Sequence, residues 1–260
     1  MIKNKNNEIK TGEKYERLIN IYNRTLNFFK KFRVRPSLLS INPFLRDIQE
    51  RMSEPTDISS HLETIFIESL LVKPKIIIEL GVRDGESTFV FERISYLTKC
   101  FVIGVDCDDC SQVLNFPGRI FVQSDSVEFL KNYCEWARSR NIQGFPDIIF
   151  IDTNHTYLQT KSELSLALSL VSAGGIVILH DTNLNIIYRR HDGTLGYGWD
   201  NKRGVIKAIE DLFDKKFNEK KIIIKQMNCG WSIFHNPLCN GLTIIRKPYS
   251  STINNLKEFK

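Results

Sequence analysis

The sequence predicts an α/β fold in which a mostly parallel sheet is covered by helices on both faces. From about residue 60 onward, short apolar runs of strand length alternate with amphipathic stretches of helix length. This alternation is typical of parallel sheets built from strand–helix–strand units. The chain has 260 residues, of which 42% are hydrophobic and 25% charged, so it can form one large domain with an appendage.

The elements follow in order along the chain. The apolar runs predict strands at about 75–80, 101–106, 119–123, 147–151 and 175–180. The amphipathic stretches predict helices near 61–72, 87–97, 126–139, 157–171 and 203–216. Two β-rich runs at 221–225 and 231–234 are separated by a short loop, which predicts an antiparallel pair at the end of the domain.

Residues 1–60 are predicted to form a separate helical extension, because prolines at 36, 43 and 55 interrupt it and disfavour helix at the preceding residue. An apolar stripe at helical spacing needs a partner surface, so we expect this extension to act as a lid or to join subunits of a homo-oligomer. The stripe consists of Leu18, Ile19, Ile21, Tyr22, Leu26 and Phe29. The main domain is expected over residues 61–260.

The net charge of +6 lies in the N-terminal part, since residues 1–55 hold twelve Lys or Arg and six Asp or Glu. Both signs are interspersed there, and no aromatic–basic alternation suggests stacking on bases, so we expect no nucleic-acid partner. No apolar run approaches the roughly 18 residues of a membrane span, and no signal peptide is evident. The six cysteines then fit reduced thiols, and a cytoplasmic location is expected.

The loop after the first strand, residues 79–88, contains Gly81 and Gly85, which allow a tight turn and close approach of the backbone to a ligand. Ser87 or Thr88 can cap the helix that follows. The G-x-x-x-G spacing lacks the third glycine of a dinucleotide fingerprint, which argues against NAD or FAD.

The next two strands also end in carboxylates, where ligands of open α/β sheets bind. Asp106 stands 27 residues after Glu79 and could accept hydrogen bonds from a ribose diol. Ser124 and Asp125 end the third strand and could take an adenine amino group. The structural alternatives are that Asp106 caps a loop and that Ser124 or Asp125 caps a helix.

Two further strands deliver ligand-type residues to the same edge. Asp152 and His155 follow the fourth strand, and His180 and Asp181 follow the fifth. A carboxylate directly after four apolar residues has little reason to be there for packing, because its desolvation is costly. We therefore expect these four side chains to converge on one crevice. Other chemistry is disfavoured: Cys107 and Cys110 lack a second ligand pair for zinc, and no G-x-S-x-G elbow is present.

These residues make the chain similar to class I S-adenosylmethionine-dependent methyltransferases, specifically to the metal-dependent O-methyltransferases of sugars and natural products, a branch grouped with macrolide-sugar O-methyltransferases and cephalosporin-hydroxylase-like proteins. The resemblance covers roughly residues 60–260. It implies a Rossmann-like, seven-stranded sheet of order 3-2-1-4-5-7-6 and a methyl donor lying across Gly81, Asp106 and Asp125. The donor-binding set it implies is Glu79, Gly81, Gly85, Ser87, Asp106, Ser124, Asp125 and Asp152.

The resemblance also implies a divalent metal, Mg²⁺ or Mn²⁺, bound by Asp152, His180 and Asp181, with His155 as general base. Relatives commonly carry an acidic residue where this chain has His180, and an imidazole ligand moves preference toward Mn²⁺ and other transition ions. Two structural alternatives stay open: His180 could be a histidine hydrogen-bonded beneath the site, and His155 a residue at a helix start without chemistry.

The predicted function is methyl transfer from S-adenosylmethionine to a hydroxyl of a sugar or nucleotide sugar. The Gly-rich, aromatic and basic segment 188–203 suits a mobile acceptor lid, in which Arg189 or Arg190 could grip a phosphate. Two alternatives remain, a catechol or polyphenol O-methyltransferase and a non-catalytic nucleotide-binding protein of a biosynthetic cluster.

Overall fold

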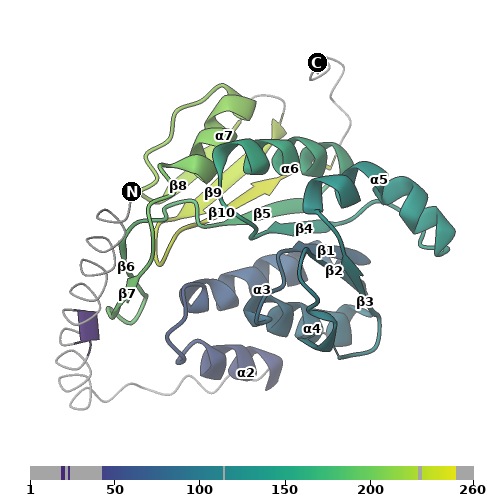
Figure 1. Cartoon of the computed structure of the whole chain (residues 1–260), viewed down its shortest axis with the longest axis horizontal. Coiled ribbons are helices and arrows are strands. Elements are labelled where there is room, and N and C mark those ends of the chain that lie inside the picture. Colours follow the sequence, from purple (N-terminus) through teal and green to yellow (C-terminus); the bar gives the residue numbers. More distant parts are fainter. Residues whose placement is uncertain (1–18, 21–22, 24–42, 114, 228–229, 250–260) are drawn as a thin grey trace, which may run out of the picture.

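The computed structural model describes residues 19–20, 23, 43–113, 115–227 and 230–249. Its centre is an eight-stranded sheet of order β3-β2-β1-β4-β5-β10-β9-β8 (Figure 1). The strands are β1 Ile76–Leu80, β2 Phe101–Asp106, β3 Arg119–Gln123, β4 Ile148–Ile151, β5 Ile176–His180, β8 Ile223–Gln226, β9 Ser232–Asn236 and β10 Leu242–Arg246.

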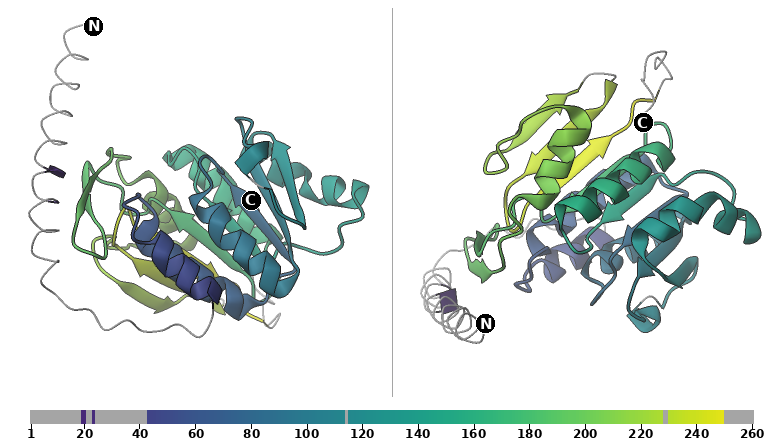
Figure 2. Two further views of the ribbon diagram at one scale, coloured as in Figure 1. Left: turned by 90° about the horizontal axis from the view of Figure 1, so that it is seen from below. Right: turned by 45° about the horizontal axis from the view of Figure 1, so that its top comes forward.

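Helices cover both faces of the sheet, as predicted (Figures 1 and 2). On one face, α2 Pro43–Arg51, α3 Leu62–Val72 and α4 Glu86–Thr98 pack against side chains such as Ile77 and Phe150. On the other, α5 Ser126–Ser139, α6 Tyr157–Leu170 and α7 Gly204–Phe213 pack against Ile78 and Ile149. Every residue of β1, β4 and β5 is buried, which explains why these strands are continuous apolar runs instead of alternating ones.

The five parallel strands and their five helices confirm the predicted elements. The strands pair in parallel in the order 3-2-1-4-5, and each begins and ends within one residue of the predicted bounds. Each carboxyl end therefore lies at the same edge of the sheet, where β1 and β4 are direct neighbours.

The C-terminal part differs from the expected seven strands. β8 and β9 form the predicted antiparallel pair, but β10 was not foreseen and inserts between β9 and β5, antiparallel to both. β10 and β9 thus take the places of strands 7 and 6 in the expected order 3-2-1-4-5-7-6, and β8 is an additional strand at the edge. The run Leu242–Arg246 follows a turn at Gly241, whose φ of +85° marks a sharp reversal of the chain.

The segment 188–203, expected as a loop, instead begins with a two-stranded sheet of β6 Ile187–Arg189 and β7 Leu195–Tyr197. This hairpin stands beside the main sheet (Figure 1). The side chain of Asn23 pairs with Leu195 as a strand would: its amide donates to the carbonyl oxygen and accepts from the backbone N–H, both at 2.6 Å.

Of the N-terminal extension, the structure describes residues 43–60, which include α2, and three earlier residues. Pro43 is the first residue of α2, in agreement with the predicted break, because proline is pre-organised for the first helical position. Ile19 of the apolar stripe is buried. The other stripe residues, Leu18, Ile21, Tyr22, Leu26 and Phe29, lie outside the described residues. Within the described ranges, no helix is long and apolar enough to cross a membrane.

Candidate active site

The loop after β1 passes very close to the end of β4. Gly81 has a φ of +87°, and a Cβ atom there would lie 2.1 Å from the carbonyl oxygen of Asp152. Gly85 has a φ of +83°, and a Cβ there would lie 2.3 Å from a methyl group of Val113. Both positions therefore require glycine, for conformation and for space.

Glu79 lies beneath this loop and not in a pocket. It is fully buried, and its two carboxyl oxygens accept hydrogen bonds from the hydroxyls of Ser87 and Thr88 at the start of α4. Burial raises the pKa of Glu79 to about 8, although both hydroxyl bonds lower it. The two hydroxyl bonds tie the start of α4 to the strand.

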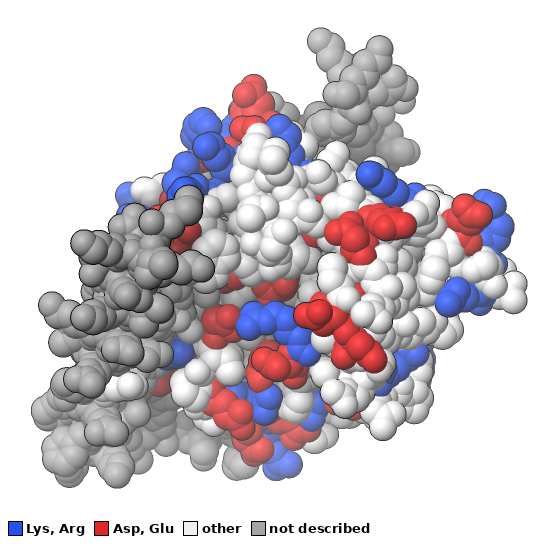
Figure 3. Space-filling view, viewed as in Figure 1, with Lys and Arg blue, Asp and Glu red and all other residues white. Residues whose placement is uncertain are grey.

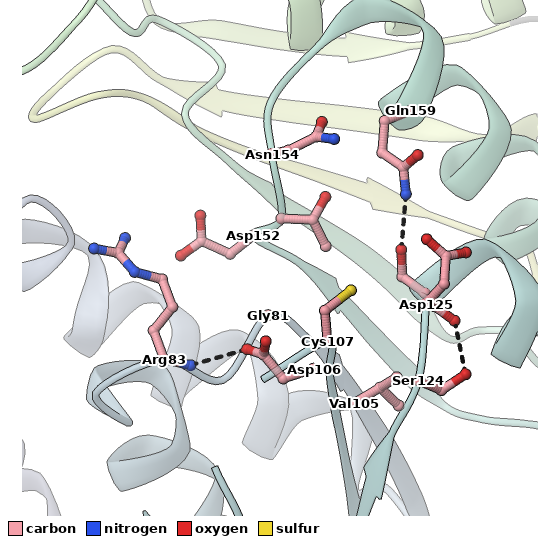
Figure 4. Close-up of a pocket in the computed structure, with 12 residues that line it drawn as sticks. Gly81, Arg83, Val105, Asp106, Cys107, Ser124, Asp125, Asp152, Asn154 and Gln159 are labelled. Atoms are coloured by element: carbon pink, nitrogen blue, oxygen red, sulfur yellow. Dashed lines mark hydrogen bonds between the residues drawn. The ribbon is translucent and has the colours of Figure 1, made fainter. Parts of the chain in front are cut away.

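A pocket of about 250 Å³ opens at the carboxyl ends of β1, β2, β3 and β4. Figure 4 shows its side chains arranged around Gly81, with Asp106, Cys107, Ser124 and Asp125 along one side and Asp152 and Asn154 along the other. Five predicted donor-binding residues line it: Gly81, Asp106, Ser124, Asp125 and Asp152. Gly85 and Ser87 line a smaller adjoining hollow of about 120 Å³ with Gly81 and Asp152.

The two carboxylates of this pocket also have structural partners. Asp106 accepts from the backbone N–H groups of Val82, Arg83 and Asp108, at 2.8, 3.2 and 3.0 Å. Asp125 caps α5 by accepting from the N–H of Glu128 at 2.9 Å. The structural alternatives given for these residues therefore apply: Asp106 caps the loop and Asp125 caps the helix. They do not exclude ligand binding, because a carboxylate has about four acceptor sites and both residues line the pocket.

Three ligand-type side chains converge where β4 and β5 end. Atoms of Asp152, His155 and Asp181 lie within 4.8 Å of one another. His155 Nε2 is 2.8 Å from Oδ2 of Asp181 and 3.8 Å from Oδ1 of Asp152. His155 and Asp181 both have a φ of +56°, an unfavourable conformation for residues with side chains that commonly marks functional positions.

His180 lies beneath this cluster. Only 1% of the residue is exposed, and its Nδ1 lies 3.1 Å from Oδ1 of Asp152 and 3.3 Å from Oδ1 of Asp181. Burial lowers the pKa of His180, but the charges of Asp181 and Asp152 outweigh burial and raise it to about 10. Of the four residues expected to converge, the structure thus brings Asp152, His155 and Asp181 together and places His180 beneath them. This is the structural alternative in which His180 is hydrogen-bonded beneath the site.

The charges within the cluster also shift the pKa values of His155 and Asp181. Burial lowers the pKa of His155, but its hydrogen bond to Asp181 and the charges of Asp181 and Asp152 leave the pKa above its ordinary value of 6.5. Burial raises the pKa of Asp181, yet His180 and His155 hold it below its ordinary value of 3.8. Asp181 therefore stays ionised, and its buried Oδ1 has no hydrogen-bond donor within the described part of the chain.

A second hollow, of about 310 Å³, reaches the cluster from the hairpin side. We call it the aromatic hollow. It is lined by Pro55, Thr56, Asp57, Arg83, His155, Asp181, Leu184, Tyr188, Tyr197, Gly198, Trp199 and Asn240. The ring of Trp199 lies against that of His155, with centroids 6.0 Å apart. Arg83 lines this hollow, the first pocket and the smaller hollow between them.

Arg190 does not have the role expected of it. The residue is 8% exposed, and its guanidinium donates to the carbonyl oxygens of Thr56 and Leu195, both at 2.9 Å, and to the hydroxyl of Tyr188 at 3.2 Å. These bonds tie the two strands of the hairpin to each other and to Thr56, in the segment between α2 and α3. Arg190 is therefore committed to these bonds. Arg189, the other residue of that expectation, is exposed, and for it the phosphate role stays a prediction.

Several lining residues were not among the predicted site residues. Arg83, Thr153, Asn154 and Gln159 line the first pocket, and Asp57, Leu184 and Asn240 line the aromatic hollow. Arg83 has a φ of +45° and sits inside the loop singled out for its glycines. Its position between two glycines was the one available signal.

The fold and the layout of the site are those of class I methyltransferase domains, as the resemblance implied. The sheet order, the glycine loop against β4 and the carboxylates ending β2 and β3 agree with that class. Residues 78–182 match the family model described as a methyltransferase domain, a stretch that includes the whole donor-side pocket.

Relatives agree with this class. A rhamnosyl O-methyltransferase of Mycobacterium leprae (strain TN) is 29% identical over 120 residues, 44% of this chain and 51% of that protein, so the match spans about half of the relative. The Podospora anserina methyltransferase PaMTH1 bound to SAH has a TM-score of 0.51 and 17% identity, covering 88% of this chain and 95% of that one. The MycE methyltransferase of the mycinamycin pathway, in complex with Mg and SAH, has a TM-score of 0.50 and 15% identity, covering 85% and 58%. At these identities the structural likenesses concern the fold.

Proposed function

We propose that this chain transfers a methyl group from S-adenosylmethionine to a hydroxyl of a sugar-type small molecule. One observation carries the proposal: the two pockets meet at the cluster of Asp152, His155 and Asp181. Asp152 lines the donor-side pocket, whereas His155 and Asp181 line the aromatic hollow. A donor in the first pocket and an acceptor in the second would thus face each other across these side chains, as in-line transfer requires.

The polar side chains that line the donor-side pocket are placed as an adenosyl group would require. Asp106 ends β2 and keeps acceptor capacity for about one more donor, such as a ribose hydroxyl, while Asp125 and Ser124 follow β3 further along the same pocket. The close approach of Gly81 to β4 leaves the floor of the pocket free of side chains. The proteins of this fold found in complex with SAH support the same donor.

The cluster fits a divalent cation, Mg²⁺ or Mn²⁺. Two carboxylates and one imidazole lie within 4.8 Å, and the buried Oδ1 of Asp181 accepts no hydrogen bond from the described residues. We assign Asp152 and Asp181 as ligands, and His180 as the residue that positions both from below. A cation bound there would lower the pKa of an acceptor hydroxyl. The complex of MycE with Mg supports this assignment.

We assign His155 as the general base. Its Nε2 lies 2.8 Å from the ionised Asp181 and donates to it, which leaves Nδ1 as the ring nitrogen that can take up a proton. Asp181 can then stabilise the imidazolium that forms. Trp199 shields one side of the ring from water. The competing role for His155 is that of a third metal ligand, since it belongs to the same cluster.

The function is tested by incubating the full chain with isotope-labelled S-adenosylmethionine, Mn²⁺ or Mg²⁺ and a panel of glycosides and catechols. Mass spectrometry should detect labelled methyl on a glycoside hydroxyl and none on the catechols. Chelation with EDTA should abolish the product, and added metal should restore it. Methylation of catechols instead would select the aromatic-acceptor alternative, and full turnover in EDTA would exclude the metal.

A further inference from the structure

We infer that the aromatic hollow takes an uncharged glycoside, whose sugar ring stacks on Trp199, and not a sugar carried on a nucleoside diphosphate. This inference rests on the proposed transfer to a sugar hydroxyl and names the form in which the sugar is presented. It is drawn from the aromatic wall of the hollow, the charges that line it and the partners of Arg190.

The aromatic wall is unusually exposed for its size. Trp199 is 48% exposed and Tyr197 42% exposed, although both line the hollow. Large apolar side chains exposed around a concavity commonly mark a ligand site. The face of an indole ring carries partial negative charge and attracts the C–H groups of a pyranose, so a sugar ring can stack there while its hydroxyls point sideways.

The position of Trp199 gives this stacking a catalytic consequence. Its ring lies 6.0 Å from that of His155, which is hydrogen-bonded to Asp181. A sugar ring on Trp199 would therefore present its hydroxyls to the residues assigned as base and metal ligand. Asn240 and Thr56 line the same hollow and offer neutral hydrogen-bonding groups to the remaining hydroxyls.

The charges of the hollow disfavour a diphosphate. Asp181 is assigned to the cation, so the charged side chains left to line the hollow are Asp57 and Arg83, and Arg83 is the one Lys or Arg among the described residues that does so. The guanidinium of Arg83 lies 3.9 Å from the carboxylate of Asp57 and is partly neutralised by it. Figure 3 shows acidic and basic side chains intermingled at the centre of this face, without a continuous basic patch. Phosphate sites in proteins usually offer several unpaired N–H donors.

Arg190 would be the natural second cation, but each of its three guanidinium nitrogens already has an acceptor. To bind a phosphate, it would have to leave the backbone oxygens of Thr56 and Leu195 and release the hairpin that carries Trp199. The guanidinium of Arg190, which a diphosphate would need, is thus already used to hold the hairpin beside Trp199.

The test compares two forms of one sugar with the full chain, the methyl glycoside and the nucleoside diphosphate ester, beginning with rhamnose because of the relative named above. Binding is measured in the presence of SAH by tryptophan fluorescence and by calorimetry. We expect the glycoside to change the fluorescence and to be methylated with a kcat/KM at least about ten-fold above that of the nucleotide sugar. Trp199→Ala should lose about ten-fold or more in kcat/KM, mainly through KM, and Trp199→Phe only a few-fold.

The controls separate this inference from the proposed chemistry. Trp136→Phe, on α5, should keep the fluorescence change, and Trp199→Phe should lose it while calorimetry still detects binding. If glycosides bind in this way but none is methylated, the inference stands and the proposed chemistry fails. A preference for the nucleotide sugar, or unchanged glycoside affinity in Trp199→Ala, would overturn the inference.

Discussion

The Nδ1 atom of His180 lies 3.1 Å from Oδ1 of Asp152, and this contact joins the ends of two neighbouring strands. β4 and β5 pair in parallel with Ile151 opposite Leu179, so Asp152, just after β4, and His180, the last residue of β5, lie at the same level. The buried imidazole also lies 3.3 Å from Asp181 and can hold both carboxylates in place. Removal of a group that hydrogen-bonds to a metal ligand and orients it commonly weakens binding of the metal.

The first prediction follows from this contact. His180→Ala should weaken Mn²⁺ binding by roughly 10- to 100-fold, because Asp152 and Asp181 lose the group between them. His180→Asn should lose less, since its amide can still donate a hydrogen bond to Asp152. Calorimetry with Mn²⁺ alone measures both effects, and excess metal should partly restore activity. Unchanged Mn²⁺ affinity in a folded His180→Ala protein would show that His180 does not position the carboxylates.

The second prediction concerns donor binding at Asp106. Asp106→Asn should weaken binding of S-adenosylmethionine by about 1.5–3 kcal/mol, the range for hydrogen bonds to a charged group. Asparagine keeps one acceptor oxygen for the glycine loop, so the fold should persist. Asp108→Asn is a matched control, because this exposed neighbour contacts Asp106 through its backbone N–H. Equal donor affinity in the two variants would mean that Asp106 is only a loop cap.

The third prediction concerns stability and Glu79. The folded pKa of about 8 lies above the ordinary value of 4.5, so the folded chain keeps a proton that the unfolded chain releases. Stability from this group is present in full below about pH 4.5 and is lost as the pH rises toward 8. Glu79→Gln mimics the protonated acid and should make the free energy of unfolding less dependent on pH across this window.

Urea denaturation at about pH 5 and pH 8.5 measures this effect. The unmodified chain should lose more stability between the two values than Glu79→Gln. Glu128→Gln, at an exposed position of α5, should behave like the unmodified chain. A Glu79→Gln protein with the same pH dependence as the unmodified chain would show that Glu79 is already ionised in the folded state.

Most of the parallel half of the sheet could be predicted because β1, β4 and β5 are buried along their whole length and β2 along most of it, so these strands are apolar runs in the sequence. β10 escaped notice although Leu242–Arg246 contains four buried residues, because it follows β9 after a short turn and no helix separates the two. The hairpin of β6 and β7 has strands of only three residues. The side chains of Arg190 and Asn23 stabilise it by hydrogen bonds to backbone groups, and no sequence pattern reveals such bonds.

The site could be predicted as far as strand ends are concerned, because parallel strands deliver the following residue to a common edge. Asp106, Asp125, Asp152 and Asp181 were found in this way. Strand ends do not reveal the direction of each side chain. Spacing therefore could not decide that His155, with its φ of +56°, would join the two carboxylates while His180 would lie below them.

The last prediction concerns the proton. If His155 is the base, His155→Ala should lower the rate by about 10²–10⁴ with little change in donor affinity. The base must be neutral to act, so the rate should rise with pH along a limb set by this imidazole. Asp181 and Asp152 raise its pKa above 6.5, and a cation bound to them lowers it again. That limb should vanish in the variant. Excess Mn²⁺ separates the two roles of the imidazole, because added metal can compensate for a lost ligand but not for a lost base. If Mn²⁺ restores the rate of His155→Ala, the imidazole is a ligand, and removal of the proton must then be assigned to another group at the hollow, such as Asp152.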